Sequence, residues 1–302
     1  MRLTQIRDFL AVVECSGVRA AARKLGVAQP TVSKSVRELE TELHVQLLGR
    51  SSRGVVLTPA GRAFHARAQA AATELRKAEE EAAQTGDAGA GSVTFSMGPV
   101  GVIAVLPEAV ARFRRQFPLA RIRVVEGYGH LMLPDVRNES LDFAFGQKST
   151  KALDASIRFR PLFQSALVIC ARKGHPLSRA RTLKGLAGGE WMATGNMREP
   201  GAAADRMFRS AGLELPQPAV QCTNHLTAMS LLAHSDMLSL TQRLMLERPP
   251  SSLFLQEITV AEAIPAVTVG LFARADTPLT RAAAAMVRHV TAVSRELALK
   301  QR

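Results

Sequence analysis

The stretch that most constrains how this chain folds is residues 17–43, which predict two short amphipathic helices on either side of a tight turn at Gly26 and Val27. In the first helix, the apolar residues recur at the i, i+3, i+4, i+7 spacing that gives a helix one buried face. The second helix carries a similar narrow stripe, formed by Val32, Val36, Leu39 and Leu43. This arrangement is typical of a helix-turn-helix motif, although an amphipathic helix pair in an ordinary bundle would show the same spacing.

The face of the second helix that lies opposite this stripe is polar and cationic. A helix turns by about 100° per residue, so this face carries Pro30, Lys34, Arg37 and Thr41, with Ser33 to one side. Long cationic side chains and hydroxyls suit phosphates and base edges, and the N–H groups of a first helical turn can point at a phosphate. We therefore expect residues 29–43 to enter a DNA major groove, with contacts from Gln29, Pro30, Thr31, Ser33, Lys34 and Arg37.

The segments on either side favour DNA binding over a helical bundle. Another helix is predicted near residues 4–15, with a buried face formed by Ile6, Phe9, Leu10 and Val13. Residues 47–58 predict a short hairpin whose glycine-containing tip carries Arg50 and Arg53. Such a hairpin is typical of a wing that touches the DNA backbone or minor groove. An all-α winged helix-turn-helix domain is therefore expected over residues 1–58.

The distribution of charge supports a polyanionic partner for this N-terminal part. The chain has a formal net charge of +13, and residues 1–67 carry 11 Lys and Arg against 5 Asp and Glu. A basic domain of this kind fits DNA. Residues 93–302 are also basic, which is consistent with an anionic ligand or with a solvated surface, and the surface is the simpler interpretation.

A long helix and a hinge are predicted after the hairpin. Thr58 and Pro59 suit an N-cap and a first helical residue, and no further proline occurs through Gln84. Steps of three and four alternate along Gly61, Phe64, Ala68, Ala71, Leu75, Ala78 and Ala82. This period of 3.5 residues predicts packing on another helix, so residues 59–85 are expected to form a linker and dimerisation helix. The alternative is a helix packed on its own domain. The glycine-rich residues 86–92 predict a hinge.

From Val93 onward, short strands alternate with helices, which predicts parallel sheets with right-handed crossovers. The first unit has expected strands at residues 93–96, 122–125 and 142–145, a loop at 97–101, a helix after that loop, and a helix at 131–139. The second unit has expected strands at residues 166–171, 191–193, 220–223 and 237–240, with helices at 202–211 and 227–234. A strand at 267–273 and a helix at 278–299 then return to the first unit, with crossings near 162–165 and 263–266.

A ligand site is expected between these two units, because ligands of open α/β sheets bind beyond the carboxyl ends of the strands. The candidates in the first unit are Ser96, Gly98, Pro99, Val100, Gly101, Tyr128 and His130. The candidates in the second unit are Asn196, Arg198, Asn224 and Thr227. Asn224 and Thr227 also lie where a helix begins, so a capping role is an equal alternative for them.

The remaining motifs exclude several classes of protein. No apolar run of 18 residues predicts a membrane span, and the charged N-terminal residues are unlike a signal peptide. Cys15, Cys170 and Cys222 show no paired spacing, which favours reduced, buried thiols over a redox pair. The His residues lack metal-ligand spacing, and no catalytic elbow, P-loop or dinucleotide fingerprint occurs, so we expect no metal, no cofactor and no catalytic residues.

Five short blocks near the N-terminus resemble the DNA-binding domain of LysR-type transcriptional regulators. The blocks are residues 20–25 (AAARKL), 28–33 (AQPTVS), 39–40 (LE), 47–50 (LLGR) and 57–61 (LTPAG). The resemblance is specific, because the five blocks keep their order and spacing over about 60 residues. Beyond them the chain shares the family's length and layout. It departs from the family at Pro99 and Val100, where members often place Ser or Thr.

The resemblance implies a second domain, residues 93–302, with the α/β two-lobed fold of periplasmic binding proteins. Lobe I would comprise residues 93–163 and 267–302, and lobe II residues 164–266. It also implies a cytoplasmic homotetramer, built as a dimer of dimers. The expected function is sequence-specific transcriptional regulation, modulated by a small-molecule effector between the lobes, rather than catalysis. The alternatives are a small-molecule-binding protein or enzyme with an accessory helical domain, and a non-specific architectural DNA binder.

Overall fold

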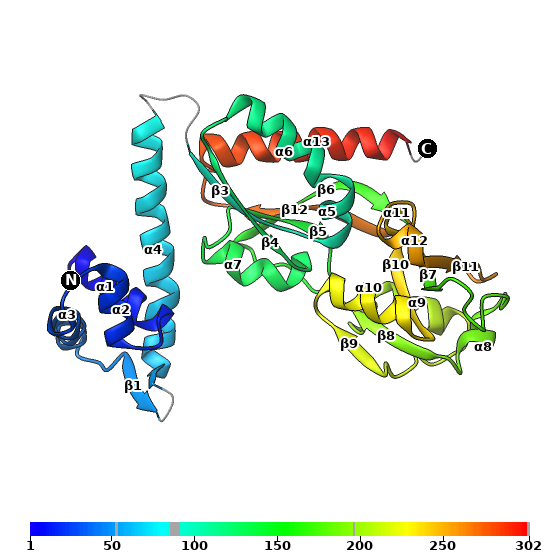
Figure 1. Cartoon of the computed structure of the whole chain (residues 1–302), viewed down its shortest axis with the longest axis horizontal. Coiled ribbons are helices and arrows are strands. Elements are labelled where there is room, and N and C mark those ends of the chain that lie inside the picture. Colours follow the sequence, from blue (N-terminus) through cyan, green and yellow to red (C-terminus); the bar gives the residue numbers. More distant parts are fainter. Residues whose placement is uncertain (52–53, 85–90, 196, 301–302) are drawn as a thin grey trace. The chain divides into compact units, whose positions relative to one another are not determined.

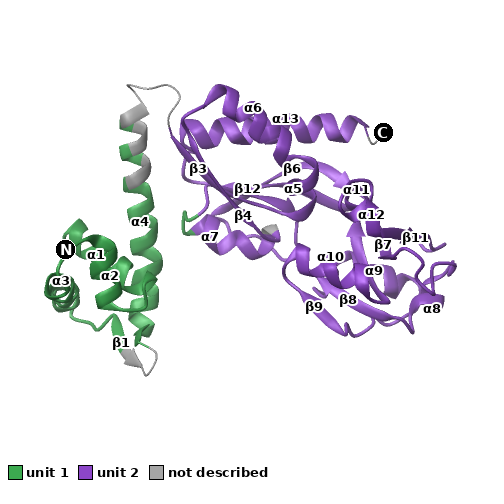
Figure 2. Cartoon of the chain, viewed as in Figure 1, with its two compact units in different colours: residues 1–82, 138–140 green, residues 83–137, 141–302 purple. Residues whose placement is uncertain are grey.

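The computed structural model describes residues 1–51, 54–84, 91–195 and 197–300. The chain divides into two compact units (Figure 2). Unit 1 comprises residues 1–82 and 138–140, and unit 2 comprises residues 83–137 and 141–302. Each unit is described here by itself, with the element labels of Figure 1.

Unit 1 begins with three helices, α1 (Leu3–Glu14), α2 (Val18–Leu25) and α3 (Gln29–Glu42). The predicted stripe of the third helix is buried at Val32, Val36 and Leu39, which pack with Phe9 and Val12 of α1. In α1 the face is rotated slightly from the prediction, because Ala11 and Val12 are buried while Leu10 and Val13 are half-buried at its edge. Gly26 ends α2 at φ 68°, a left-handed conformation that glycine adopts without steric cost.

The hairpin is formed by β1 (Leu48–Ser51) and β2 (Gly54–Leu57), which pair antiparallel. The Glu40 carboxylate of α3 holds it to that helix by accepting hydrogen bonds from the N–H groups of Leu47 (2.8 Å) and Leu48 (3.0 Å). The long helix α4 (Pro59–Gln84) follows, and Thr58 caps it by accepting a hydrogen bond from the Gly61 N–H at 2.9 Å. The expected N-cap is therefore confirmed.

Unit 2 contains two five-stranded sheets, each covered by helices on both faces (Figure 1). The first sheet has the order β4 (Arg121–Glu126), β3 (Ser92–Met97), β5 (Phe143–Gln147), β12 (Val267–Arg274) and β6 (Ile157–Ser165). One face packs on α5 (Pro99–Ala104), α6 (Leu106–Gln116) and α13 (Arg281–Lys300). The other face packs on α7 (Leu133–Arg137), which follows the 3-10 helix η1 (Gly129–Met132).

The second sheet has the order β11 (Leu255–Ile258), β7 (Leu167–Arg172), β10 (Met237–Gln242), β8 (Glu190–Thr194) and β9 (Val220–Cys222). One face packs on α8 (Leu183–Leu186) and α9 (Ala203–Ser210), and Trp191 is buried there against Phe208. The opposite face packs on α10 (His225–His234). The short helices α11 (Arg243–Leu246) and α12 (Ser251–Phe254) lie between β10 and β11. The chain passes between the two sheets after β6 and again before β12.

Several sequence predictions were wrong in detail. The sheets are mixed rather than parallel, because β12 pairs antiparallel with β5 and β6, and β7 pairs antiparallel with β10 and β11. Strands β6 and β11 were missed, since neither shows a strict alternation of apolar and polar residues. Residues 97–101 are not all loop, because α5 begins at Pro99. The predicted helix at 131–139 is η1 followed by α7, and the last helix begins at Arg281 rather than at 278.

Candidate functional site

The outward face of α3 presents the cationic surface that its sequence predicts. Gln29, Pro30, Thr31, Lys34 and Arg37 are exposed, and Ser33 is half-buried. The Lys34 side chain is 80% exposed, and its ammonium lies 3.9 Å from the Glu38 carboxylate, a spacing at which an exposed pair is weak. Arg53 lies outside the described residues, as does the side chain of Arg50.

The three carboxylates of α3 are each engaged by other parts of unit 1. Glu38 accepts a hydrogen bond from the Arg2 guanidinium, and Glu42 from the N-terminal ammonium at 2.7 Å. Glu40 binds the two backbone N–H groups before and within β1. Glu38 and Glu42 are thus paired with cations outside α3, while Lys34 and Arg37 stay exposed on its outward face.

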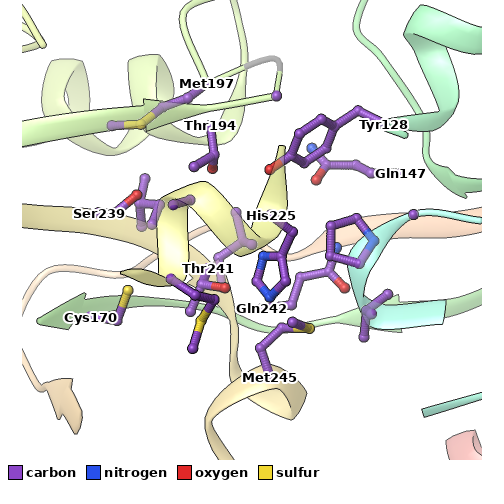
Figure 3. Close-up of a pocket in the computed structure, with 18 of the residues that line it drawn as sticks. Tyr128, Gln147, Cys170, Thr194, Met197, His225, Ser239, Thr241, Gln242 and Met245 are labelled. Carbon is purple, nitrogen blue, oxygen red and sulfur yellow. The ribbon is translucent and has the colours of Figure 1, made fainter. Parts of the chain in front are cut away.

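In unit 2, a cavity of about 100 Å³ lies between the two lobes (Figure 3). Five of the predicted residues line it, all of them from the first lobe: Gly98, Pro99, Val100, Tyr128 and His130. Gly98 lies in the turn after β3, Pro99 and Val100 begin α5, Tyr128 precedes η1 and His130 lies in η1. The expectation that a ligand binds beyond the carboxyl ends of the strands therefore located one wall of the cavity.

The other predicted effector residues that the structure describes do not line this cavity. Ser96 is fully buried in β3, and Gly101 faces the core, where an added Cβ would lie 2.3 Å from the Met97 sulfur. The Arg198 guanidinium donates to the Pro216 carbonyl at 3.4 Å. Asn224 caps α10 by accepting a hydrogen bond from the Thr227 N–H at 3.0 Å, so the capping alternative is confirmed for Asn224, while Thr227 lies in the first turn of the helix. Asn196 lies outside the described residues.

The second wall is made of residues that the sequence reasoning missed. Most of this wall comes from lobe II and is apolar, and its polar side chains include Thr194, His225, Ser239, Thr241 and Gln242; Gln147, also missed, belongs to lobe I. Gln147, Thr194 and Gln242 are the last residues of β5, β8 and β10. The signal that could have found them is their position, because a strand's carboxyl end faces the ligand crevice in an α/β fold.

Burial sets the protonation of the groups around the cavity. It raises the pKa of the Tyr128 phenol to about 12, against a hydrogen bond with the Thr194 side chain that acts in the opposite direction. Burial also lowers the pKa of His130 and of His225. The Cys170 thiol is fully buried, which raises its pKa to about 12 and leaves it unreactive as a nucleophile. The cavity can bind a small molecule, but it holds no activated nucleophile among the residues described.

Two family descriptions match the chain. Residues 3–62 match the bacterial regulatory helix-turn-helix protein of the lysR family, and residues 86–295 match the LysR substrate binding domain. The chain belongs to the LysR family of transcriptional regulators. The expectations of a winged helix-turn-helix, a two-lobed α/β effector domain and a regulator rather than an enzyme are thereby confirmed.

Individual relatives are distant in sequence. The transcriptional regulator GalR of Pseudomonas putida is 28% identical over 295 residues, which is 97% of this chain and 74% of GalR. TdcA of Escherichia coli is 28% identical over 61% of this chain, and the match spans only 59% of TdcA. The crystal structure of CbnR, a LysR family regulator, covers 97% of this chain and 99% of CbnR, with a TM-score of 0.72 at 19% identity. A second CbnR structure, in complex with its target DNA, has a TM-score of 0.70.

LysR regulators bind promoter DNA and small-molecule effectors, and this chain carries both family domains. Within the described residues, no helix combines the length and the apolar character needed to cross a bilayer. The same residues contain no cluster of three or more His, Cys, Asp or Glu side chains that could hold a metal ion.

Proposed function

We propose that this regulator reads its operator through the outward face of α3, with Gln29, Pro30 and Thr31 at base edges and Ser33, Lys34 and Arg37 at phosphates or a guanine edge. The observation that carries this proposal is the exposure of Lys34 and Arg37 beside carboxylates already engaged within unit 1. Arg50 and Arg53 of the wing would add contacts to the DNA backbone or minor groove.

The chain is proposed to consist of a DNA-binding domain (residues 1–58), a dimerisation helix (59–85), a hinge (86–92) and an effector domain (93–302). The C-terminal part of the α4 seam supports this role, because Leu75 is 43% exposed and Ala71, Ala78 and Ala82 are exposed as well, whereas Gly61, Phe64 and Ala68 pack within unit 1. An apolar stripe that unit 1 leaves uncovered suits a second copy of the helix. Pairs of such dimers would form a homotetramer acting on DNA in the cytoplasm.

The effector is proposed to act by changing how the two lobes meet. The cavity is lined from both lobes, and direct contacts already join them beside it. Tyr128 of lobe I hydrogen-bonds Thr194 of lobe II, and the Ser149 hydroxyl donates to the Glu199 carboxylate at 2.6 Å. A molecule that binds one lobe arrangement more tightly shifts the population toward it, and this shift can alter the spacing of the DNA-binding domains in an oligomer.

The DNA-binding face is tested by gel-shift titration of Lys34→Ala and Arg37→Ala at fixed salt, with a duplex selected by the wild-type chain from random sequences. Each substitution should weaken binding by about 1–3 kcal/mol if the side chain contacts a base, which is roughly 5- to 150-fold. If the side chain instead contacts a phosphate, its loss should weaken binding to all DNA sequences alike and reduce the salt dependence of the affinity.

The matched control is Lys173→Ala, which removes one exposed cation from unit 2 and should leave the affinity unchanged. Wild-type affinity in both α3 variants would show that DNA does not dock on this face.

A further inference from the structure

The inter-lobe cavity has a lining without formal charge. Among the described residues that form it there is no Asp, Glu, Lys or Arg. Its polar groups are the Tyr128 phenol, hydroxyls, carboxamides and two imidazoles, and its apolar parts include the Met197, Met229 and Met245 side chains. A ligand enclosed here therefore meets hydrogen-bonding groups on an apolar background, with no counter-ion built into the wall.

The charged groups that act on the two lining imidazoles are acidic or already paired. The Glu199 carboxylate lies 4.0 Å from the His130 imidazole, and the Lys151 ammonium lies 3.6 Å from Glu199. The Glu126 carboxylate acts on His225 from the end of β4. Arg198 donates to a backbone carbonyl outside the cavity. These groups therefore offer no unpaired cation to an anion buried in the cavity.

The two imidazoles are neutral near pH 7. Burial lowers the pKa of His130, which faces Glu199 and Lys151, and Glu199 opposes that shift only in part. Burial also lowers the pKa of His225, against the opposing effect of Glu126. Neutral imidazoles can donate one hydrogen bond and accept another, but they supply no positive charge to a ligand.

The two helices that begin beside the cavity, α10 and α5, each lack one free first-turn donor. In α10 the first-turn N–H of Thr227 is already bound by the Asn224 side chain. In α5 the first residue, Pro99, has no N–H, and the helix is only six residues long. An anion placed here would lose its hydration without gaining a charged partner, which is the costly case of burial.

We propose that this cavity selects an effector without formal charge, a small molecule with a carboxamide, ester or hydroxyl group on an apolar body. This inference rests on the proposed effector role of the same cavity. It departs from the anionic ligand that the basic composition of unit 2 suggested, because the cations of unit 2 do not line the cavity. The volume of about 100 Å³ also sets the size of the ligand, since an apolar cavity of about 150 Å³ holds benzene.

The test compares isosteric pairs that differ in charge: isobutyramide with isobutyrate, and benzamide with benzoate. The full chain is labelled at its methionine methyl groups, so the Met197, Met229 and Met245 signals report occupancy of the cavity by NMR at pH 7.5. At least one amide should shift these three signals, with a Kd at least tenfold below that of its carboxylate. A carboxylate that binds as tightly as its amide, or a cavity that no amide enters, would overturn the proposal.

A charge placed in the wall gives a second, independent test. Gln242→Lys should reverse the preference toward the carboxylates, while the matched Gln242→Met, of similar length and uncharged, should retain it. Both variants lose the same contact, the hydrogen bond from the Ser165 hydroxyl to the Gln242 carboxamide. Trp191 fluorescence verifies that each variant is folded. An unchanged preference in folded Gln242→Lys would also count against the proposal.

The DNA titration of the ligand-free chain separates this inference from the proposed function. Tight carboxylate binding with a normal response to Lys34→Ala and Arg37→Ala would refute only the neutral ligand. Normal amide selection without any DNA binding would refute only the operator-reading face.

Discussion

Replacing Glu40 with alanine should loosen the attachment of the wing, the β1–β2 hairpin, to α3. The Glu40 carboxylate accepts two backbone N–H groups, from Leu47 at 2.8 Å and Leu48 at 3.0 Å. A hydrogen bond to a charged group contributes about 1.5–3 kcal/mol, and Glu40 is half-buried, so the lower part of that range applies. Both donors share one oxygen, Oε1, so their contributions add only in part, and the expected loss for the pair is about 2–4 kcal/mol because alanine leaves both donors without an acceptor.

The measurement is hydrogen exchange of the Leu47 and Leu48 amides, read by mass spectrometry on peptides spanning residues 44–50. A loss of about 2–4 kcal/mol in local opening corresponds to exchange that is roughly 30- to 900-fold faster. Trp191 lies in unit 2, so its fluorescence should be unchanged and serves as an internal control.

Glu42→Ala is the matched control on the same helix. Glu42 pairs only with the exposed N-terminal ammonium, and an exposed pair contributes about 0–1 kcal/mol. If Glu40→Ala exchanged at the same rate as Glu42→Ala, the assignment of Glu40 as the anchor of the wing would be refuted. Glu40→Gln retains one acceptor oxygen, so its amide exchange rate should lie between those of Glu40→Ala and Glu42→Ala.

Two further predictions concern the junction of α4 and the pH dependence of unit 2. Gly61→Ala should destabilise unit 1 by about 1–3 kcal/mol despite the better helix propensity of alanine, because its Cβ would lie 2.0 Å from the Leu47 carbonyl oxygen. Thermal unfolding followed by circular dichroism measures this, and a melting point at or above that of the wild type would contradict it. The stability of unit 2 should be fully present above pH 6.5 and decline below it. The reason is that burial lowers the pKa of His130 and His225, so the unfolded chain binds more protons in that window. Urea midpoints from Trp191 fluorescence at pH 7.5 and 5.5 test this, and the decline should be smaller in His225→Gln; an equal decline in that variant would assign the effect elsewhere.

The local features of unit 1 could be predicted because their signals lie within a few residues of one another. The stripe of Val32, Val36 and Leu39 repeats at the helical period, and Gly26 marks the end of α2. Thr58 and Pro59 likewise mark the start of α4. Helices form from contacts three and four residues apart, so sequence spacing alone contains the necessary information.

Most of unit 2's detail depends on residues that are distant in sequence. Strands β6 and β11 become strands by pairing with β12 and β7, and the antiparallel direction of those pairs is set by where the chain crosses between lobes. Asn224 could have been a cap or a ligand contact until α10 was seen to use it as a cap.

The amino-acid sequence by itself determined the two-domain plan, the amphipathic helix α3 and the first wall of the cavity, because periodicity, caps and strand ends are local properties. Only the tertiary structure decided the second wall, with Thr194, His225 and Gln242, and with it the absence of formal charge among the described lining residues. The physical reason is that a cavity's electrostatics depend on which side chains converge in space, and the net charge of the chain does not record that convergence.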